Sequence, residues 1–122
     1  MMLNNVITVG KDLQILQLAG QFGLEVFSAD DIKESLDIIK RVNPELVIFN
    51  NQFSAADLKK FISVLNKKCN PCVVYVDKDV SGNSSQTFLD AGANYYLNGP
   101  KDYHKLNEIV NKINGTAVKD AD

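Results

Sequence analysis

Polar residues that could bind ions or act as nucleophiles occur in five short groups along the chain. Each group directly follows a short apolar segment. Carboxylates in such groups could hold a divalent cation or act as nucleophiles, and a lysine ammonium group could bind an anion. The amide of Asn50 has the shape of a carboxylate but no anionic oxygen, so it cannot attack phosphorus or balance the charge of a metal ion. The five groups are Gly10-Lys11-Asp12, Ser28-Ala29-Asp30, Asn50-Asn51-Gln52, Asp77-Lys78-Asp79 and Asn98-Gly99-Pro100.

The apolar segments before these groups have the pattern of buried strands. They are short and rich in β-branched residues, and three of them are almost continuously apolar. That composition is typical of parallel strands covered on both faces. The predicted strands are residues 6–9, 24–27, 46–49, 73–76 and 94–97.

Each group is followed by apolar residues at helical spacing, with capping residues at the ends of the segment. The sequence therefore predicts five helices. They run from Leu13 to Phe22 with Gly23 as C-cap, from Ile32 to Val42, from a capping box at Ser54–Asp57 through Leu65, from Ser84 or Ser85 to Gly92, and from a cap at Asp102 through Ile113.

The strict alternation of strands and helices predicts an α/β domain with a doubly wound, five-stranded parallel sheet and helices on both faces. Right-handed crossovers would bring all five polar groups to one edge of that sheet, where such folds bind ligands. A length of 122 residues with 45% hydrophobic content fits one domain with one core. We expect the domain in residues 1–114 and a linker or disordered tail in residues 115–122.

Charge and hydropathy exclude some classes of function. A net charge of -2 and a pI near 5.3 give no electrostatic support for nucleic-acid binding. No apolar run is long enough to span a bilayer, and residues 1–5 lack the pattern of a secretion signal. We therefore expect a cytoplasmic protein that contacts neither nucleic acid nor membrane.

Three stretches of the chain are distinctive: NPELVIFN at residues 43–50, NPCVVYV at residues 70–76 and AGANYYLNGP at residues 91–100. They resemble the third strand, the fourth strand and the run from Ala-Gly-Ala to Lys-Pro in receiver domains of two-component response regulators. The resemblance extends from about Val6 to Ile113, and it implies a flavodoxin-like fold with the strand order 2-1-3-4-5. A shared fold does not imply a shared activity, so each site position of this chain has to be compared with the corresponding position of the family.

The chain departs from the receiver pattern at every position where the family binds Mg²⁺ or takes part in phosphoryl transfer. A receiver holds Mg²⁺ with an acidic pair after its first strand and accepts phosphate on a carboxylate after its third. The family has a hydroxyl and then a small residue at the end of the fourth strand, and a lysine before the proline after the fifth. The corresponding residues here are Gly10 and Lys11, then Asn50, Val76, Asp77, and Gly99 before Pro100.

These differences imply a degenerate receiver, or pseudo-receiver, which binds no metal or cofactor and is not an enzyme. Mg²⁺ needs hard anionic oxygens, and phosphoryl transfer depends on electrostatic stabilisation by the metal and the lysine. Asp77 would repel a phosphoryl group by about 4 kcal/mol per unit charge at about 4 Å, for an effective dielectric constant near 20. Lys11 could reach toward Asp77 or Asp79 and place an ammonium group where receivers have the metal and lysine.

We expect the domain to act by protein–protein contact, as a regulatory or docking module in two-component signal transduction. The interaction face would be the helix–strand–helix surface of residues 84–114, and it would include Tyr96 and His104. The partner would be a second copy in a homodimer, an attached output domain or another signalling protein. Two alternatives stay open: a receiver phosphorylated on a displaced carboxylate, which would be Asp12, Asp77 or Asp79, and a small-ligand sensor of flavodoxin-like fold.

Tyr96 occupies the position of an aromatic residue that helps couple the receiver site to the output face. In the family that residue changes position together with the hydroxyl on the fourth strand. Because Val76 has only methyl groups, we expect this hydrogen-bonding partner to be lost. Tyr96 would then either anchor a partner or pack between the last two helices, and we expect Tyr95 to be the inward ring.

The motif Cys69-Asn70-Pro71-Cys72 has the spacing of a thioredoxin-like redox pair. Such pairs follow a strand and begin a helix, where the thiolate is stabilised, whereas this pair follows a helix and begins a strand. A zinc site would need more ligands than two cysteines and one histidine. We expect Cys72 to lie in the core and His104 to lie on the surface.

Overall fold

Strands and helices alternate along the chain, as the sequence predicts. The computed structural model describes residues 5–21, 25–50, 53–65, 71–77, 85–99 and 101–119, with side chains as far as residue 112. The strands are β1 (Asn5–Val9), β2 (Glu25–Ala29), β3 (Leu46–Asn50), β4 (Cys72–Asp77) and β5 (Tyr95–Asn98). The helices are α1 (Leu13–Gly20), α2 (Ile32–Arg41), α3 (Ala55–Leu65), α4 (Ser85–Asp90) and α5 (His104–Lys119).

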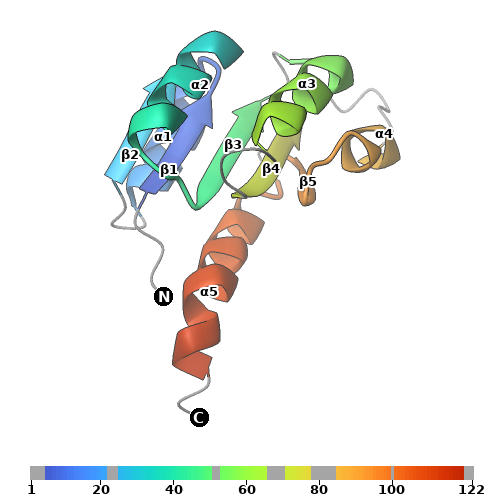
Figure 1. Ribbon diagram of the computed structural model, residues 1–122. Helices are drawn as coiled ribbons and strands as arrows, with labels where there is room; N and C mark the ends of the chain where they lie inside the picture. The colour runs from blue at the N-terminus through green and yellow to red at the C-terminus, as the bar shows by residue number, and fades with distance from the viewer. Residues whose placement is uncertain are drawn as a thin grey trace.

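The five strands form one parallel sheet in the order β2-β1-β3-β4-β5 (Figure 1). This order confirms the fold class that the sequence predicted. All residues of β3 are buried, because β3 lies at the centre of the sheet between β1 and β4. A central strand of a parallel sheet is covered on both faces and has no solvent-exposed face, so its sequence is continuously apolar.

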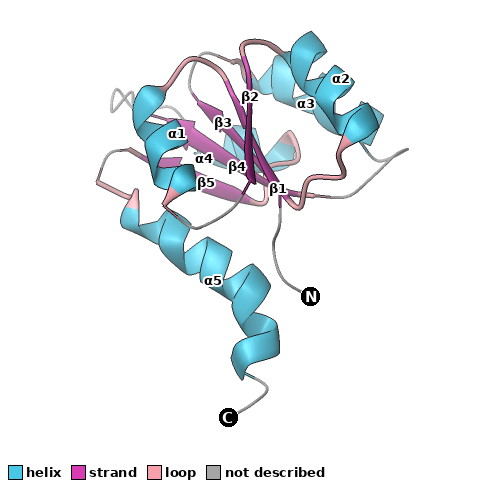
Figure 2. Ribbon diagram, turned by 90° about the vertical axis from the view of Figure 1, so that its left-hand side faces the viewer, coloured by secondary structure: helices cyan, strands magenta, loops and turns pink. Residues whose placement is uncertain are grey.

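Helices cover both faces of the sheet (Figure 2). Ile15 of α1 and Leu106 of α5 belong to one buried cluster, on one face. Ile38 of α2, Phe61 of α3 and Phe88 of α4 belong to a second cluster, on the opposite face. The sheet therefore has two separate hydrophobic layers, and each strand contributes alternate side chains to each layer.

Edge-to-face aromatic contacts fix α3 on the central strand. The ring of Phe49 lies 4.7 Å from the ring of Phe61 and 5.6 Å from the ring of Phe53, between centroids, in both cases near the perpendicular. Each such contact adds about 0.5–1.5 kcal/mol to the stabilisation that comes from burial alone. These contacts hold the end of β3 rigidly, at the point where Asn50 leaves the strand.

Helix starts are stabilised by the short polar residues that the sequence places there. The predicted capping box of α3 is present: the backbone N–H of Asp57 donates to Ser54 Oγ, and the backbone N–H of Ser54 donates to Asp57 Oδ2, each at 3.1 Å. Asp31 caps α2 in the same way, with Glu34 reaching back to the N–H of Asp30 at 2.7 Å. These caps fix where each helix begins relative to the preceding strand.

The end of α1 differs from the prediction. The helix ends at Gly20 instead of Phe22, and the backbone N–H of Gln21 bonds to carbonyl groups of the last turn. Glycine is a poor helix former, which favours the earlier end. The predicted C-cap, Gly23, lies outside the described residues.

Helix α5 also differs from the prediction at both ends. It begins at His104, while the expected cap, Asp102, lies in the preceding turn. It continues to Lys119, beyond the predicted end at Ile113 and into the residues that were expected to form a linker or tail. One glycine in a helix costs about 1 kcal/mol, which does not stop a helix that is already formed. The domain boundary at residue 114 stays a prediction. Over the described ranges, no helix combines the length and apolar character needed to cross a membrane.

The capping box of α3 gives a test of these local contacts. Ser54→Ala removes the side-chain acceptor of the Asp57 N–H and should lower the free energy of unfolding by about 1 kcal/mol. Ser63→Ala is the matched control, because the Ser63 hydroxyl bonds to a carbonyl within the same helix; its change should stay within about 0.5 kcal/mol. Urea unfolding followed by circular dichroism measures both variants, and equal losses would contradict the capping role.

Candidate functional site

The carboxyl ends of the strands meet along one edge of the sheet. Asn50 at the end of β3 is paired in register with Val76, and Asp77 at the end of β4 is paired with Asn98. Gly10 follows β1, which pairs with both β2 and β3. The candidate site residues within the described part of the chain therefore do lie at one edge, as the sequence predicted.

Asn50 packs directly on the backbone of Gly10. The Asn50 side chain is buried, and a Cβ atom at residue 10 would lie 2.7 Å from Asn50 Cγ, closer than real side chains approach. Gly10 also has a φ of 107°, in the left-handed region that favours glycine. The backbone at residue 10 therefore has no room for the acidic side chain that a receiver carries there.

Asp77 is fully buried and is hydrogen-bonded to Tyr96. Its exposed fraction is 0%, and the Tyr96 hydroxyl donates to Asp77 Oδ2 at 2.6 Å. The expectation that Tyr96 has lost its partner on the fourth strand is therefore wrong. The acceptor lies one residue beyond Val76, and it is a carboxylate instead of a hydroxyl. The prediction failed because it considered only position 76.

The amide of Asn50 and the carboxylate of Asp77 leave the sheet on opposite faces. Successive side chains along a strand alternate between faces. Tyr75 belongs to the cluster under α2, α3 and α4, so Asp77 shares that face, while Val76 belongs to the cluster under α1 and α5. Ile48 is in this second cluster too, and Asn50, two residues further along β3, shares its face.

Two stacked aromatic rings, those of Tyr75 and Phe88, hold the ring of Tyr96 in place. The ring of Tyr75 lies 4.0 Å from that of Phe88 and 6.0 Å from that of Tyr96, and Phe88 lies 5.6 Å from Tyr96. The Tyr75 hydroxyl donates to the carbonyl oxygen of Phe53 at 2.6 Å. Burial, and then the charges of Asp77 and Asp57, raise the pKa of Tyr75. The stack joins β4, β5 and α4 into one unit.

Tyr103 is a site residue that sequence reasoning missed. Its ring packs on Gly99, where a Cβ atom would lie 2.8 Å from Tyr103 Cζ. A lysine at position 99 would therefore have to displace this ring. Burial, followed by the charge of Asp12, raises the pKa of Tyr103, and its buried hydroxyl has no hydrogen-bond partner among the described residues. The only sequence signal is an aromatic residue four positions after Gly99.

The turn that positions Tyr103 is held by Asp102. Its carboxylate accepts a hydrogen bond from the backbone N–H of Asn98 at 2.9 Å, and Lys105 Nζ lies 3.6 Å from its other oxygen. The bond from Asn98 is the main cause that lowers the pKa of Asp102, with the charge of Lys105 acting in the same direction. This carboxylate therefore stabilises the turn in its ionised form.

The structure places the remaining predicted pocket residues in different surroundings. Asp12 is the N-cap of α1, and its Oδ1 accepts from the backbone N–H groups of Gln14 and Ile15 at 3.0 and 3.2 Å. Lys11 is exposed, and its pairing with an acidic residue stays a prediction. Asp79 lies outside the described residues.

The predicted interaction residues lie on two sides of β5. Tyr96 packs in the cluster under α4, whereas Tyr95 packs against the cluster under α5, with Lys112 Nζ 5.9 Å from its ring centroid. Both tyrosines are partly buried, so the expectation of one inward ring at Tyr95 is wrong. His104 is exposed, as predicted, and its Nδ1 lies 3.0 Å from the carbonyl oxygen of Lys101.

Cys72 has the environment of an unreactive thiol. It is half-buried at the start of β4, and burial raises its pKa to about 11, opposed by the charge of Lys112. The thiol is therefore protonated near neutral pH, whereas redox-active cysteines are thiolates. Cys69, the other half of the motif, lies outside the described residues.

The donor set at the sheet edge does not suit Mg²⁺, which prefers several anionic oxygens in octahedral geometry. Asn50 offers an amide, Gly10 has no side chain, Asp12 is engaged as a helix cap, and Asp77 is bonded to Tyr96. Nowhere in the described ranges do three or more His, Cys, Asp or Glu side chains gather in a way that could hold a metal ion.

Known proteins resemble this chain in structure more than in sequence. No protein-family model and no curated protein matches it. A CheY-like response regulator receiver domain protein from Methanospirillum hungatei JF-1 matches with a TM-score of 0.72 and 23% identity, over 97% of this chain and 98% of that one. A two-component response regulator from Clostridium difficile matches with a TM-score of 0.72 and 18% identity, over 90% and 94%.

A third solved structure is a complex of two signalling proteins. The receiver domain of the Saccharomyces cerevisiae response regulator Ssk1, crystallised with the histidine phosphotransfer protein Ypd1, matches with a TM-score of 0.74 and 16% identity, over 96% of this chain and 93% of that one. The chain therefore has the fold of response-regulator receiver domains. At these identities the likeness establishes the fold, and it confirms the flavodoxin-like topology that the sequence predicted.

The packing of Asn50 on Gly10 predicts a coupling between two substitutions. Gly10→Ala should lower the free energy of unfolding by about 2–4 kcal/mol, because it adds backbone strain and a clash with the amide. Asn50→Ala removes the clash but leaves the strain, so the double variant should regain part of the loss.

Urea unfolding of the two single variants and the double variant measures this coupling. Gly20→Ala is the control, since residue 20 is helical with open space around it and should gain about 0.5–1 kcal/mol. Strictly additive losses at positions 10 and 50 would contradict the direct contact.

Proposed function

We propose that this protein is a receiver-like signalling module that is not phosphorylated, is not an enzyme, and acts by contact with another protein. The proposal rests on the hydrogen bond from Tyr96 to the buried carboxylate of Asp77. This bond occupies the aromatic residue that receivers use to couple their site to the output face. The coupling residue is therefore held by the chain itself, without a phosphoryl group.

The position of the phosphoacceptor supports the absence of phosphorylation. Asn50 has no anionic oxygen with which to attack phosphorus. It is also 5% exposed and packed on Gly10, so a phosphate donor has little access to this side chain. The ring of Tyr103 fills the space at Gly99, where the family has its lysine.

The displaced carboxylates are poor substitutes. Asp77 has no exposed surface and already accepts the hydrogen bond from Tyr96, so a phosphate donor could reach it only if β4, β5 and α4 moved apart. One oxygen of Asp12 accepts two backbone N–H groups at the start of α1. A phosphoryl group on Asp12 would take one of its two carboxylate oxygens and make the remaining oxygen a weaker acceptor for those N–H groups.

A fixed Tyr96 would present one unchanging face to a partner. The stacked rings of Tyr75, Phe88 and Tyr96 join α4 to the sheet, and a hydrogen bond to a carboxylate is stronger than one between neutral groups. Leu89, at 37% exposure on α4, and the ring of Tyr95 on β5 supply apolar surface for contact. A protein partner is consistent with the complex of the Ssk1 receiver with Ypd1.

The lack of phosphoryl chemistry is tested by intact-mass measurement. After incubation with acetyl phosphate and Mg²⁺, the protein should show no phosphoryl adduct, because Asn50 has no anionic oxygen and no group of described side chains could hold a metal ion. An active receiver domain treated in parallel is the control that the reagent works. An adduct that maps to Asp12, Asp77 or Asp79 would contradict the proposal and favour a receiver with a displaced acceptor.

The role of the Tyr96–Asp77 bond is tested by removing one hydroxyl. Tyr96→Phe leaves a buried carboxylate without this donor and should lower the free energy of unfolding by about 1–3 kcal/mol. It should also shift the backbone amide resonances of α4 and β5. Tyr95→Phe removes the same group from the neighbouring ring on the other face and is the matched control. The role is disproved if both substitutions have equally small effects.

A further inference from the structure

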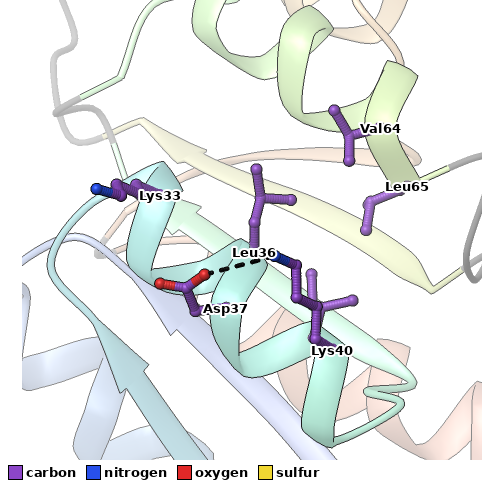
Figure 3. A pocket seen from close by; sticks show the side chains of 7 residues that line it. Lys33, Leu36, Asp37, Lys40, Val64 and Leu65 are labelled. Atoms are coloured by element: carbon purple, nitrogen blue, oxygen red, sulfur yellow. Dashed lines mark ion pairs between the residues drawn. The ribbon is translucent and has the colours of Figure 1, made fainter.

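A hollow lies between α2 and α3, away from the strand ends and from the face formed by α4, β5 and α5. Its volume is about 310 Å³. Figure 3 shows side chains from both helices directed toward it. We call it the α2–α3 groove. Leu36 and Ile39 of α2 and Val64 and Leu65 of α3 line it, together with Lys33 and Lys40 of α2.

The floor of the α2–α3 groove is apolar and partly open to water. Ile39 and Leu65 are core residues with 4% and 2% exposure, whereas Leu36 is only partly buried. Val64 is 38% exposed, one of three large hydrophobic side chains in the described residues that are left in solvent. In Figure 3 Leu36 points from α2 toward the space beside Val64 and Leu65 of α3. This surface would gain free energy if a partner covered it.

The rim of the groove is basic. Lys33 and Lys40 are seven residues apart, so they lie on the same face of α2. Asp37 is the one acidic lining residue, and its contact with Lys40 is long, at 3.9 Å, between side chains that are 60% and 64% exposed. An exposed pair of this kind is held weakly, so it can exchange Asp37 for a carboxylate of a partner.

The remaining acidic residues of the two helices do not offset this basic rim. Glu34 and Asp57 both accept hydrogen bonds from backbone N–H groups at the helix starts. The chain as a whole has a net charge of -2, whereas the two helices have more basic than acidic residues. The basic residues are Lys33, Lys40, Arg41, Lys59 and Lys60, and the acidic residues are Glu34, Asp37 and Asp57.

We propose that the α2–α3 groove is a docking surface for an amphipathic helix of a partner protein, with an apolar stripe flanked by acidic residues. A furrow between two helices accepts the side-chain ridge of a third helix. The volume is at the lower end of the range for small-molecule pockets, about 300–1,000 Å³. The three polar residues of the lining, Lys33, Asp37 and Lys40, all belong to α2, and the rest of the lining is apolar. Acidic residues beside the stripe would complement Lys33 and Lys40. This surface is separate from the contact face proposed above.

The proposal is tested with two synthetic helical peptides and the full chain labelled with ¹⁵N. The first peptide has leucine at helical positions i, i+3, i+4 and i+7 and glutamate on both sides of that stripe. The second has lysine in place of every glutamate. The first should shift the amide resonances of α2 and α3 in a saturable way, and the second should bind at least about tenfold more weakly. Equal binding of both peptides, or of neither, would overturn the proposal.

Surface variants locate the binding. Val64→Glu should weaken binding of the acidic peptide about tenfold. Leu13→Glu changes a residue that is 76% exposed on α1, across the sheet, and should have no effect. Lys33→Glu should also weaken binding, while Lys59→Glu, the same charge change on a residue outside the groove lining, should weaken it much less.

Two further outcomes would overturn the proposal. If Val64→Glu and Leu13→Glu have the same effect, the peptide does not bind in the groove. Analytical ultracentrifugation of the unmodified chain tests whether a second copy of this chain occupies the groove. A dimer that Val64→Glu dissociates and Leu13→Glu leaves intact would assign the groove to a second copy of this chain instead of a partner helix.

Discussion

The hydrogen bond from the Tyr96 hydroxyl to the buried carboxylate of Asp77 is the interaction on which the carboxyl edge of the sheet depends. A carboxylate that is removed from water is stable only with donors around it. Tyr96 is one such donor, at 2.6 Å, and it can stay there only while its ring remains stacked on Phe88 and Tyr75. The burial of one acidic group thus constrains β4, β5 and α4 together.

The same edge is filled by side chains of the protein at two further points. The amide of Asn50 lies against Gly10, and the ring of Tyr103 lies against Gly99. Receivers have a long or charged side chain at the positions of both glycines. In this protein Asn50 and Tyr103 occupy the volume that those side chains would fill. We infer that this edge does not carry out phosphoryl transfer.

The fold could be predicted from the sequence because its signals are local or periodic. Parallel strands covered on both faces need continuous apolar runs, as in β3, and the capping box at Ser54 is a four-residue pattern. Asn50 could be placed at the edge for the same reason, since it ends such a run. The end of α5 could not be placed, because continuing a formed helix by a few residues changes the free energy very little.

The contacts within the site could not be predicted, because they depend on distances between elements far apart in the sequence. The bond between Tyr96 and Asp77 joins two residues nineteen positions apart, and it requires both the strand register and the faces on which the side chains lie. Tyr103 reaches Gly99 only because the turn after β5 is closed by Asp102. Position-by-position comparison with a family finds missing groups but does not find what replaces them.

We infer that the face formed by α4, β5 and α5 has one state, which phosphate chemistry does not change. The most direct test records ¹H–¹⁵N spectra of the whole chain with Mg²⁺ and then with beryllofluoride, which mimics an acyl-phosphate. The resonances of Asn50, Asp77, Tyr96 and Leu89 should stay unchanged with both reagents. Saturable shifts of these resonances with Mg²⁺ and beryllofluoride would show that this face responds to phosphate chemistry.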